Sequence, residues 1–156
     1  MKVVFLESPV GILRIMGDIQ VIKHITFCDQ AGREDPSEVL HDCRQQLIEY
    51  FNKKRQRFTI PIQPSGTAFQ MEVWDLVCHI PYGHTLSYSE IARELGSTKK
   101  VRAVGMANGK NPIPIIIPCH RVIGTNGALT GYAGGIERKR WLLDLEKEFI
   151  QLSLFN

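Results

Sequence analysis

The polar segment 63–66, which contains a proline and a glycine, is the best candidate for a linker in the chain. Before it, short apolar runs alternate with turn-type clusters, as is typical of antiparallel strands. After it, apolar residues recur every three to four positions, as is typical of amphipathic helices. We therefore predict two domains, 1–66 and 67–156, in a chain of 156 residues. This length buries enough surface for a core without disulfides or metals.

The N-terminal domain is predicted to be a small α/β (α+β) unit. Turn residues bound three apolar runs, and Pro36 precedes a stretch with helical spacing. The pattern predicts, in chain order, antiparallel strands at 3–6, 12–16 and 21–27, a helix at about 39–51 and a short strand at 58–62.

The C-terminal domain is predicted to be mainly helical. Capping-box pairs, Thr67 with Gln70 and Ser87 with Glu90, open two of its helices, and Ser97 is placed to cap a third. The expected helices run to about residues 80, 95 and 108, and a last helix covers about 136–149. Two short helices separated by a glycine are typical of a helix-turn-helix, although many such pairs do not bind DNA.

Positive charge is concentrated in the middle of this second domain. Residues 95–121 contain five basic side chains and no acidic one, although the whole chain carries a net charge of only +3. Small residues alternate with these charges along the predicted helix 98–108, which would let its backbone approach a phosphate backbone closely. A solvated helix face is the alternative interpretation.

The segment 118–122 reads Pro-Cys-His-Arg-Val and follows three consecutive isoleucines. The reactivity of Cys119 depends on forming thiolate, and an adjacent base such as His120 can promote this at neutral pH. The other three cysteines are predicted to be buried structural thiols: Cys28, Cys43 and Cys78. Cys119 is therefore the candidate nucleophile.

The composition excludes several classes of protein. Hydrophobic residues make up 44% and charged residues 22%, which is typical of a globular protein, and no apolar run approaches the length of a membrane span. We expect a cytoplasmic protein with free thiols, because no export signal is recognisable and the cysteines are scattered. The spacing of histidines and cysteines matches no paired zinc-ligand pattern, so no metal site is predicted.

Several motifs together closely resemble the O6-alkylguanine-DNA alkyltransferases, also called methylated-DNA protein-cysteine methyltransferases. The motifs span roughly residues 67–146 and are the segments 103–109, 111–112, 117–123, 131–135 and 141–143. The resemblance implies a ribonuclease-like N-terminal domain and a helical C-terminal domain with a winged-helix-like helix-turn-helix. It also implies direct DNA repair, in which an alkyl group moves from guanine O6, or less often thymine O4, to a cysteine and the protein is consumed.

The resemblance implies a role for each residue of the reacting centre. Cys119 would accept the alkyl group, and His120 would take the thiol proton, through a water. Glu146 would orient and charge-stabilise that imidazole. Asn111 would hold the turn that presents the cysteine, and Tyr88 would donate a proton to the departing guanine.

The partner implied is double-stranded DNA that contains alkylated bases, bound by a monomer without any cofactor. Arg102 would enter the base stack in place of an extruded nucleotide, because the target carbon is inaccessible within a stacked duplex. The residues expected at the DNA are Tyr88, Ser89, Ser97, Arg102, Ala103 and Thr125, and those around the extruded base are Gly105, Val122, Tyr132 and Ala133.

Alternatives remain open at this stage. Cys119 could be a buried structural thiol, Glu146 a solvated helix residue, and Arg121 either a loop brace or a DNA contact. The rival functions are a noncatalytic protein that binds alkylated bases and a helix-turn-helix transcription regulator. A cysteine hydrolase is disfavoured because the sequence shows no clear oxyanion signature.

Overall fold

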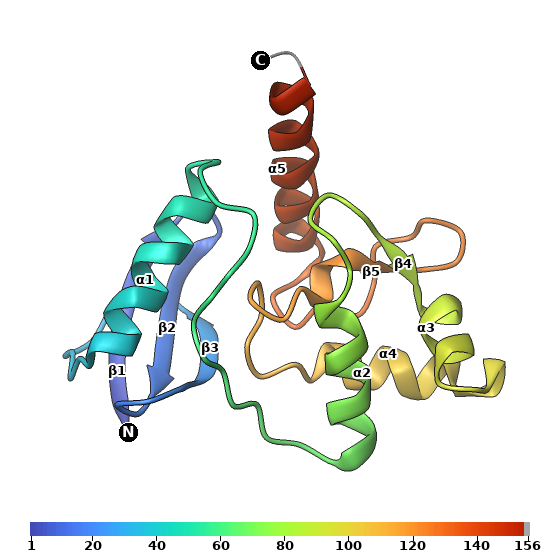
Figure 1. Ribbon diagram of the computed structural model, residues 1–156, viewed down its shortest axis with the longest axis horizontal. Helices are drawn as coiled ribbons and strands as arrows, with labels where there is room; N and C mark the ends of the chain where they lie inside the picture. The colour runs from blue at the N-terminus through green and yellow to red at the C-terminus, as the bar shows by residue number, and fades with distance from the viewer. Residues whose placement is uncertain (155–156) are drawn as a thin grey trace. The chain divides into compact units, whose positions relative to one another are not determined.

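The computed structural model describes the backbone of residues 1–154 and the side chains of residues 1–150 (Figure 1). The chain divides into two compact units between Ser65 and Gly66. No helix in the described part is long and apolar enough to cross a membrane. The same residues contain no group of three or more His, Cys, Asp or Glu side chains suited to holding a metal ion.

The first unit is a three-stranded antiparallel sheet with one helix packed against it. The strands β1 (Lys2–Ser8), β2 (Gly11–Gly17) and β3 (Ile22–Cys28) lie in the order β1-β2-β3, and α1 (Glu38–Phe51) follows. Strand pairing aligns Val4, Ile15 and Ile25, which are all buried on the side that contacts α1. The predicted meander and helix are confirmed.

The predicted strand at 58–62 is wrong. This segment makes an isolated parallel bridge between Ile22 and Ile62, with hydrogen bonds from Ile22 to the Pro61 carbonyl (3.0 Å) and from Gln63 to the Ile22 carbonyl (2.8 Å). Pro61 and Pro64 lack the amide N–H that a ladder requires, so the pairing does not extend into a strand.

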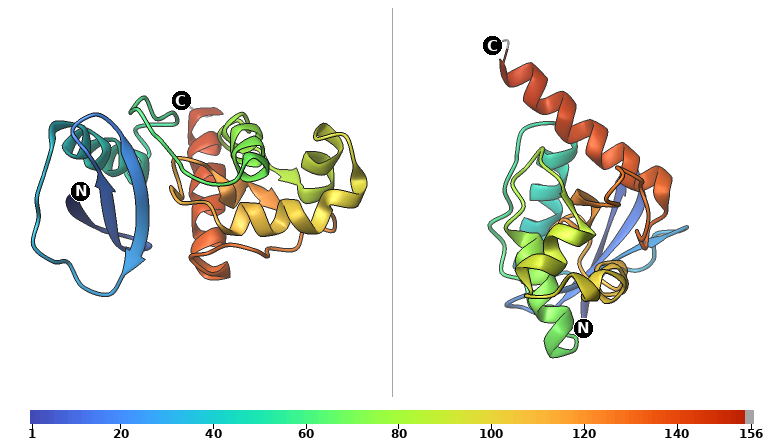
Figure 2. Two further views of the ribbon diagram at one scale, coloured as in Figure 1. Left: turned by 90° about the horizontal axis from the view of Figure 1, so that it is seen from below. Right: turned by 90° about the vertical axis from the view of Figure 1, so that its right-hand side faces the viewer.

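The described residues of the second unit form four α-helices. They are α2 (Ala68–Cys78), α3 (Tyr88–Glu94), α4 (Val101–Gly109) and α5 (Ile136–Leu154). In the two views of Figure 2, α2, α3 and α4 pack together. The helix α5 contacts the short 3-10 helix η2 (Cys119–Arg121). The indole of Trp74 on α2 donates to the Ala107 carbonyl of α4 (2.8 Å), which fixes α4 against α2.

The helix starts follow the predicted caps. Thr67 and Gln70 form the complete capping box at α2, and the Ser87 hydroxyl accepts from the Glu90 amide (3.0 Å) at α3. The helix predicted at 98–108 begins instead as a 3-10 turn, η1 (Thr98–Lys100), which Ser97 caps by accepting from the Lys99 amide (3.2 Å). The last helix extends five residues beyond its predicted end at 149.

A two-stranded parallel ribbon connects distant parts of this unit. In it β4 (Leu86–Ser87) pairs with β5 (Val122–Ile123). Because α3 begins directly after β4 and η2 ends directly before β5, the ribbon brings Tyr88 close to the Cys119 segment. Cys78, which was predicted to be buried, is exposed at the end of α2, because its side chain falls outside the buried stripe of Val73, Trp74 and Val77.

Candidate active site

The loop before Cys119 is held from the inside by one side chain. The Oδ1 of Asn111 accepts from the Ile113 amide (2.9 Å), and its Nδ2 donates to the Ile117 carbonyl (2.8 Å). Ile115 lies in this loop with φ +75° and is 1% exposed, although a β-branched residue strongly disfavours that conformation. Such a residue costs about 1–3 kcal/mol and persists only where its surroundings enforce it. The loop therefore presents Cys119 in one fixed position.

Cys119 is a thiol at neutral pH. It is 3% exposed, and burial raises its pKa to about 11, although a hydrogen bond from Asn111 and the charge of Lys139 act in the opposite direction. A thiol with such a pKa is a poor nucleophile until a base takes its proton.

His120, which follows Cys119 in the chain, is held by Glu146. Its Nε2 lies 2.6 Å from Oε2 of Glu146, and both residues are buried. Because a carboxylate only accepts hydrogen bonds, Nε2 carries the proton and Nδ1 keeps a lone pair. That Nδ1 is buried and has no hydrogen-bond partner among the described residues. Burial lowers the pKa of His120 and outweighs the opposing effect of Glu146, so the imidazole is neutral.

Glu146 is fixed by further donors. Arg121 donates from Nε to Oε1 (2.8 Å) and from Nη2 to Oε2 (3.1 Å), and the Gly83 amide donates to Oε1 (3.1 Å). Burial acts to raise the pKa of Glu146, but the bonds from His120 and Arg121 hold it well below its usual value. Arg121 thus braces the loop, one of the two roles that the sequence left open, and Glu146 is not a solvated helix residue.

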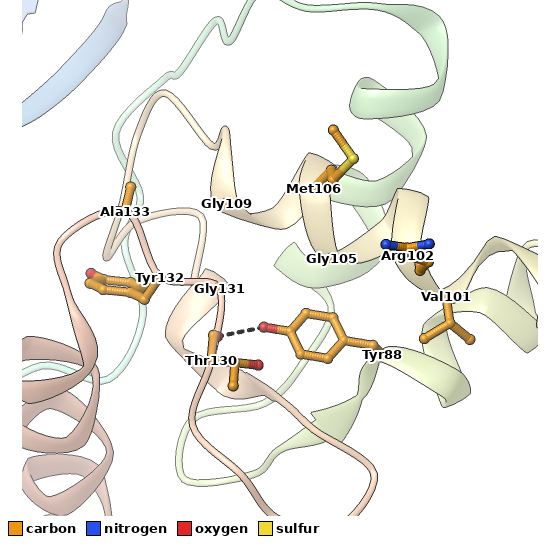
Figure 3. A pocket seen from close by; sticks show the side chains of 10 residues that line it. All are labelled: Tyr88, Val101, Arg102, Gly105, Met106, Gly109, Thr130, Gly131, Tyr132 and Ala133. Carbon is orange, nitrogen blue, oxygen red and sulfur yellow. Dashed lines mark hydrogen bonds between the residues drawn. The ribbon is translucent and has the colours of Figure 1, made fainter.

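Tyr88 points into a pocket beside this centre (Figure 3). The cavity is about 660 Å³ in volume, and its walls come from α3, α4 and the loop before α5. The Tyr88 hydroxyl donates to the Thr130 carbonyl (2.7 Å). Gly131 adopts φ +66°, and a Cβ there would lie 2.9 Å from the Tyr88 hydroxyl, so only glycine fits this close approach.

Lys139 is a site residue that the sequence analysis missed. Its side chain is fully buried, and Nζ donates to the carbonyls of Val122 and Thr130 and lies 3.4 Å from the Tyr88 hydroxyl. Burial lowers its pKa to about 8, although the nearby Cys119 acts to raise it. Its spacing from Leu142 and Glu146 places it on the inward face of α5, and this spacing could have predicted from the sequence that Lys139 is buried.

Comparison with known proteins decides the family. The model of the 6-O-methylguanine DNA methyltransferase DNA binding domain matches residues 68–148, and that of the ribonuclease-like domain of the same proteins matches residues 1–64. The chain belongs to the 6-O-methylguanine DNA methyltransferase family. This confirms the resemblance inferred from the motifs.

Individual members of the 6-O-methylguanine DNA methyltransferase family match over most of the chain. A methylated-DNA–protein-cysteine methyltransferase of Methanosarcina barkeri is 44% identical over 149 residues, which are 91% of this chain and 94% of that protein. The crystal structure of Mycobacterium tuberculosis O6-methylguanine methyltransferase superposes with a TM-score of 0.88 at 41% identity and covers 99% of both chains. The Mycobacterium tuberculosis protein in complex with DNA has a TM-score of 0.86 at 43% identity, covering 97% of this chain and 98% of that one.

The structure gathers most of the predicted site residues into two groups. The first consists of Cys119 with Asn111, which holds the loop before it, and of the hydrogen-bonded pair His120 and Glu146. The second lines the pocket and comprises Tyr88, Arg102, Gly105, Tyr132 and Ala133.

The remaining predicted residues have other surroundings. Val122 is fully buried and offers its carbonyl to Lys139 instead of lining the pocket. Ser89 and Thr125 are bonded to each other (2.8 Å), which ties α3 to the loop after β5. Ser97 caps η1, and Ala103 is exposed on α4.

Proposed function

We propose that this protein repairs DNA by direct reversal. It transfers a methyl or larger alkyl group from O6 of guanine, and less often from O4 of thymine, to Sγ of Cys119. The main observation behind this proposal is the buried Cys119 next to His120. The Nε2 of His120 is held by Glu146, and its Nδ1 has no hydrogen-bond partner among the described residues. Family membership supports the same reaction.

The first step is loss of the thiol proton. A water molecule relays this proton from Cys119 to Nδ1 of His120, and Glu146 stabilises the resulting imidazolium. The thiolate then attacks the alkyl carbon, so that a carbon–sulfur bond forms as the carbon–oxygen bond to guanine breaks. Because no group here can cleave the thioether, each molecule acts once.

The second requirement is a proton for the departing guanine. Negative charge grows on the base as the carbon–oxygen bond breaks, and Tyr88 supplies the proton. The ammonium of Lys139, 3.4 Å from the Tyr88 oxygen, stabilises the phenolate that remains. This role of Lys139 explains a buried lysine that otherwise costs stability.

DNA binding is assigned to the exposed side of η1 and α4. Lys99, Lys100 and Arg102 are exposed there, and no acidic residue lies between 95 and 121. Arg102 replaces the nucleotide that is flipped into the pocket, which offsets part of the unstacking cost of a few kcal/mol. Ser97, Ala103 and the Ser89–Thr125 pair contact the duplex beside it. We propose that the protein acts as a cytoplasmic monomer on double-stranded DNA and needs no cofactor.

The stoichiometry of repair tests this function. Protein is mixed with an excess of a duplex that contains one O6-methylguanine, and lesion loss is counted per molecule of protein. One lesion per molecule supports the proposal, with Cys119→Ser as the inactive control. A protein that binds without lesion loss, or that prefers a defined undamaged sequence, is instead a binding protein or a transcription regulator.

A further inference from the structure

Arg121 occupies a position that the alkyl-transfer steps do not use. It is 6% exposed, and two of its nitrogens bind the two oxygens of Glu146, at 2.8 and 3.1 Å. Its third nitrogen, Nη1, donates to the Ile80 carbonyl (2.8 Å), and the guanidinium lies over the Tyr82 ring, 5.5 Å from its centroid. The guanidinium is thus locked in the fork geometry that suits a carboxylate.

The same carboxylate contacts His120, so its negative charge interacts with both Arg121 and His120. A buried carboxylate 2.6 Å from an imidazole would by itself favour imidazolium, and such a neighbour raises a histidine pKa by about 1–3 units. With Arg121 present, the carboxylate and guanidinium already balance each other. A proton taken from solvent would then add an unbalanced charge to a buried cluster, whereas a proton taken from Cys119 leaves a thiolate that balances it.

We propose that Arg121 is a positioning residue for alkyl transfer, because by binding both oxygens of Glu146 it keeps His120 an uncharged imidazole whose Nδ1 can accept the thiol proton. The inference rests on the proposed function.

The other ionisable groups around this cluster do not replace Arg121. Lys139 on α5 also acts to lower the pKa of His120, but its effect is smaller than that of Arg121. Tyr82 in the loop after α2 faces the cluster too, and burial raises its pKa, so it is uncharged at neutral pH. Cys78 is exposed at the end of α2, but its sulfur is partly desolvated, which raises its pKa to about 11, so it is uncharged as well. Cys119 is likewise uncharged, since burial raises its pKa to about 11.

The titration of His120 measured by NMR tests the proposal directly. Full-length protein labelled with ¹³C-histidine is titrated, and the His120 signal is assigned by its absence in His120→Asn. We expect the wild-type midpoint to lie below the ordinary value of about 6.5, and the Arg121→Met midpoint to be higher by about 1 unit or more. Arg121→Lys keeps the charge, so its midpoint should stay near that of the wild type.

The pH dependence of single-turnover repair gives the second measurement. The acid limb of the rate should move to higher pH in Arg121→Met by the same amount as the NMR midpoint. A folded Arg121→Met protein with an unchanged midpoint overturns the proposal. If that variant does not fold, the wild-type midpoint decides: a value at or above about 6.5 overturns the proposal and a lower one supports it. Absence of alkyl transfer in the wild type, with midpoints that shift as expected, would reject the proposed function and leave the charge balance standing.

Discussion

Removing only the hydroxyl of Tyr88 separates proton donation from every other role of that residue. In Tyr88→Phe the ring keeps its place near Gly105, and the Thr130 carbonyl that loses the hydroxyl still accepts from Lys139 (2.7 Å). No buried acceptor is left unpaired, so the free energy of unfolding should fall by only about 1 kcal/mol.

The rate of alkyl transfer should fall much more than the stability. A positioned general acid contributes about 10²–10⁴-fold, and Lys139 at 3.4 Å from the lost oxygen is a partial substitute. We therefore expect a loss near the lower end, about 10²-fold, which corresponds to about 2.7 kcal/mol in the activation free energy.

Rapid-quench single-turnover kinetics with an O6-methylguanine duplex would measure this loss. Fluorescence anisotropy would measure DNA affinity in parallel, with both proteins in a Cys119→Ser background so that no transfer occurs. An unchanged transfer rate would refute the assignment of Tyr88 as the acid. A loss of affinity as large as the loss of rate would show that the hydroxyl serves binding instead.

Three further perturbations test other parts of the account. Gly131→Ala should displace Tyr88 and slow transfer, because φ +66° and a Cβ 2.9 Å from the Tyr88 hydroxyl are both unfavourable for alanine; a wild-type rate would contradict this. Replacing Lys99 or Lys100 with glutamine should reduce the salt dependence of DNA binding by about 0.9 logarithmic units per decade, whereas a surface that does not meet DNA would leave the slope unchanged. The pKa of Glu146 is lower in the folded than in the unfolded protein, so the unfolded state binds more protons as the pH falls. Glu146 therefore contributes stability above about pH 4.3, and this stability is lost as the pH falls below that value. Denaturant midpoints measured from pH 7 to 3 should therefore fall less steeply in Glu146→Gln, and parallel curves would argue against the pair.

Much of the architecture was predictable because it rests on local rules. Apolar runs bounded by turn residues placed the strands, three-to-four-residue apolar spacing placed the helices, and cap residues such as Thr67 placed the helix starts. Cys119, His120 and Glu146 were found from a linked set of motifs, since their spacing alone does not show that side chains from η2 and α5 meet.

The remaining features depend on tertiary context. A lysine is rarely fully buried, so Lys139 was not assigned to the site. Its three oxygen neighbours come from separate segments of the chain, so sequence spacing does not show that they meet. The left-handed conformation of Ile115 is likewise imposed by Asn111 and the buried surroundings, against the preference of isoleucine. The segment 58–62 shows that local chemistry can also prevent a predicted element, because two prolines lack the N–H groups that a strand needs although the segment is apolar.

The mass of the peptide that contains Cys119 tests the central claim most directly. After incubation with a duplex that carries one O6-methylguanine, the protein is digested and each cysteine-containing peptide is weighed. We expect one methyl group on Cys119, in proportion to the lesions lost, and none on Cys28, Cys43 or Cys78. An unmodified Cys119 peptide from a sample in which the lesion has disappeared would contradict the account.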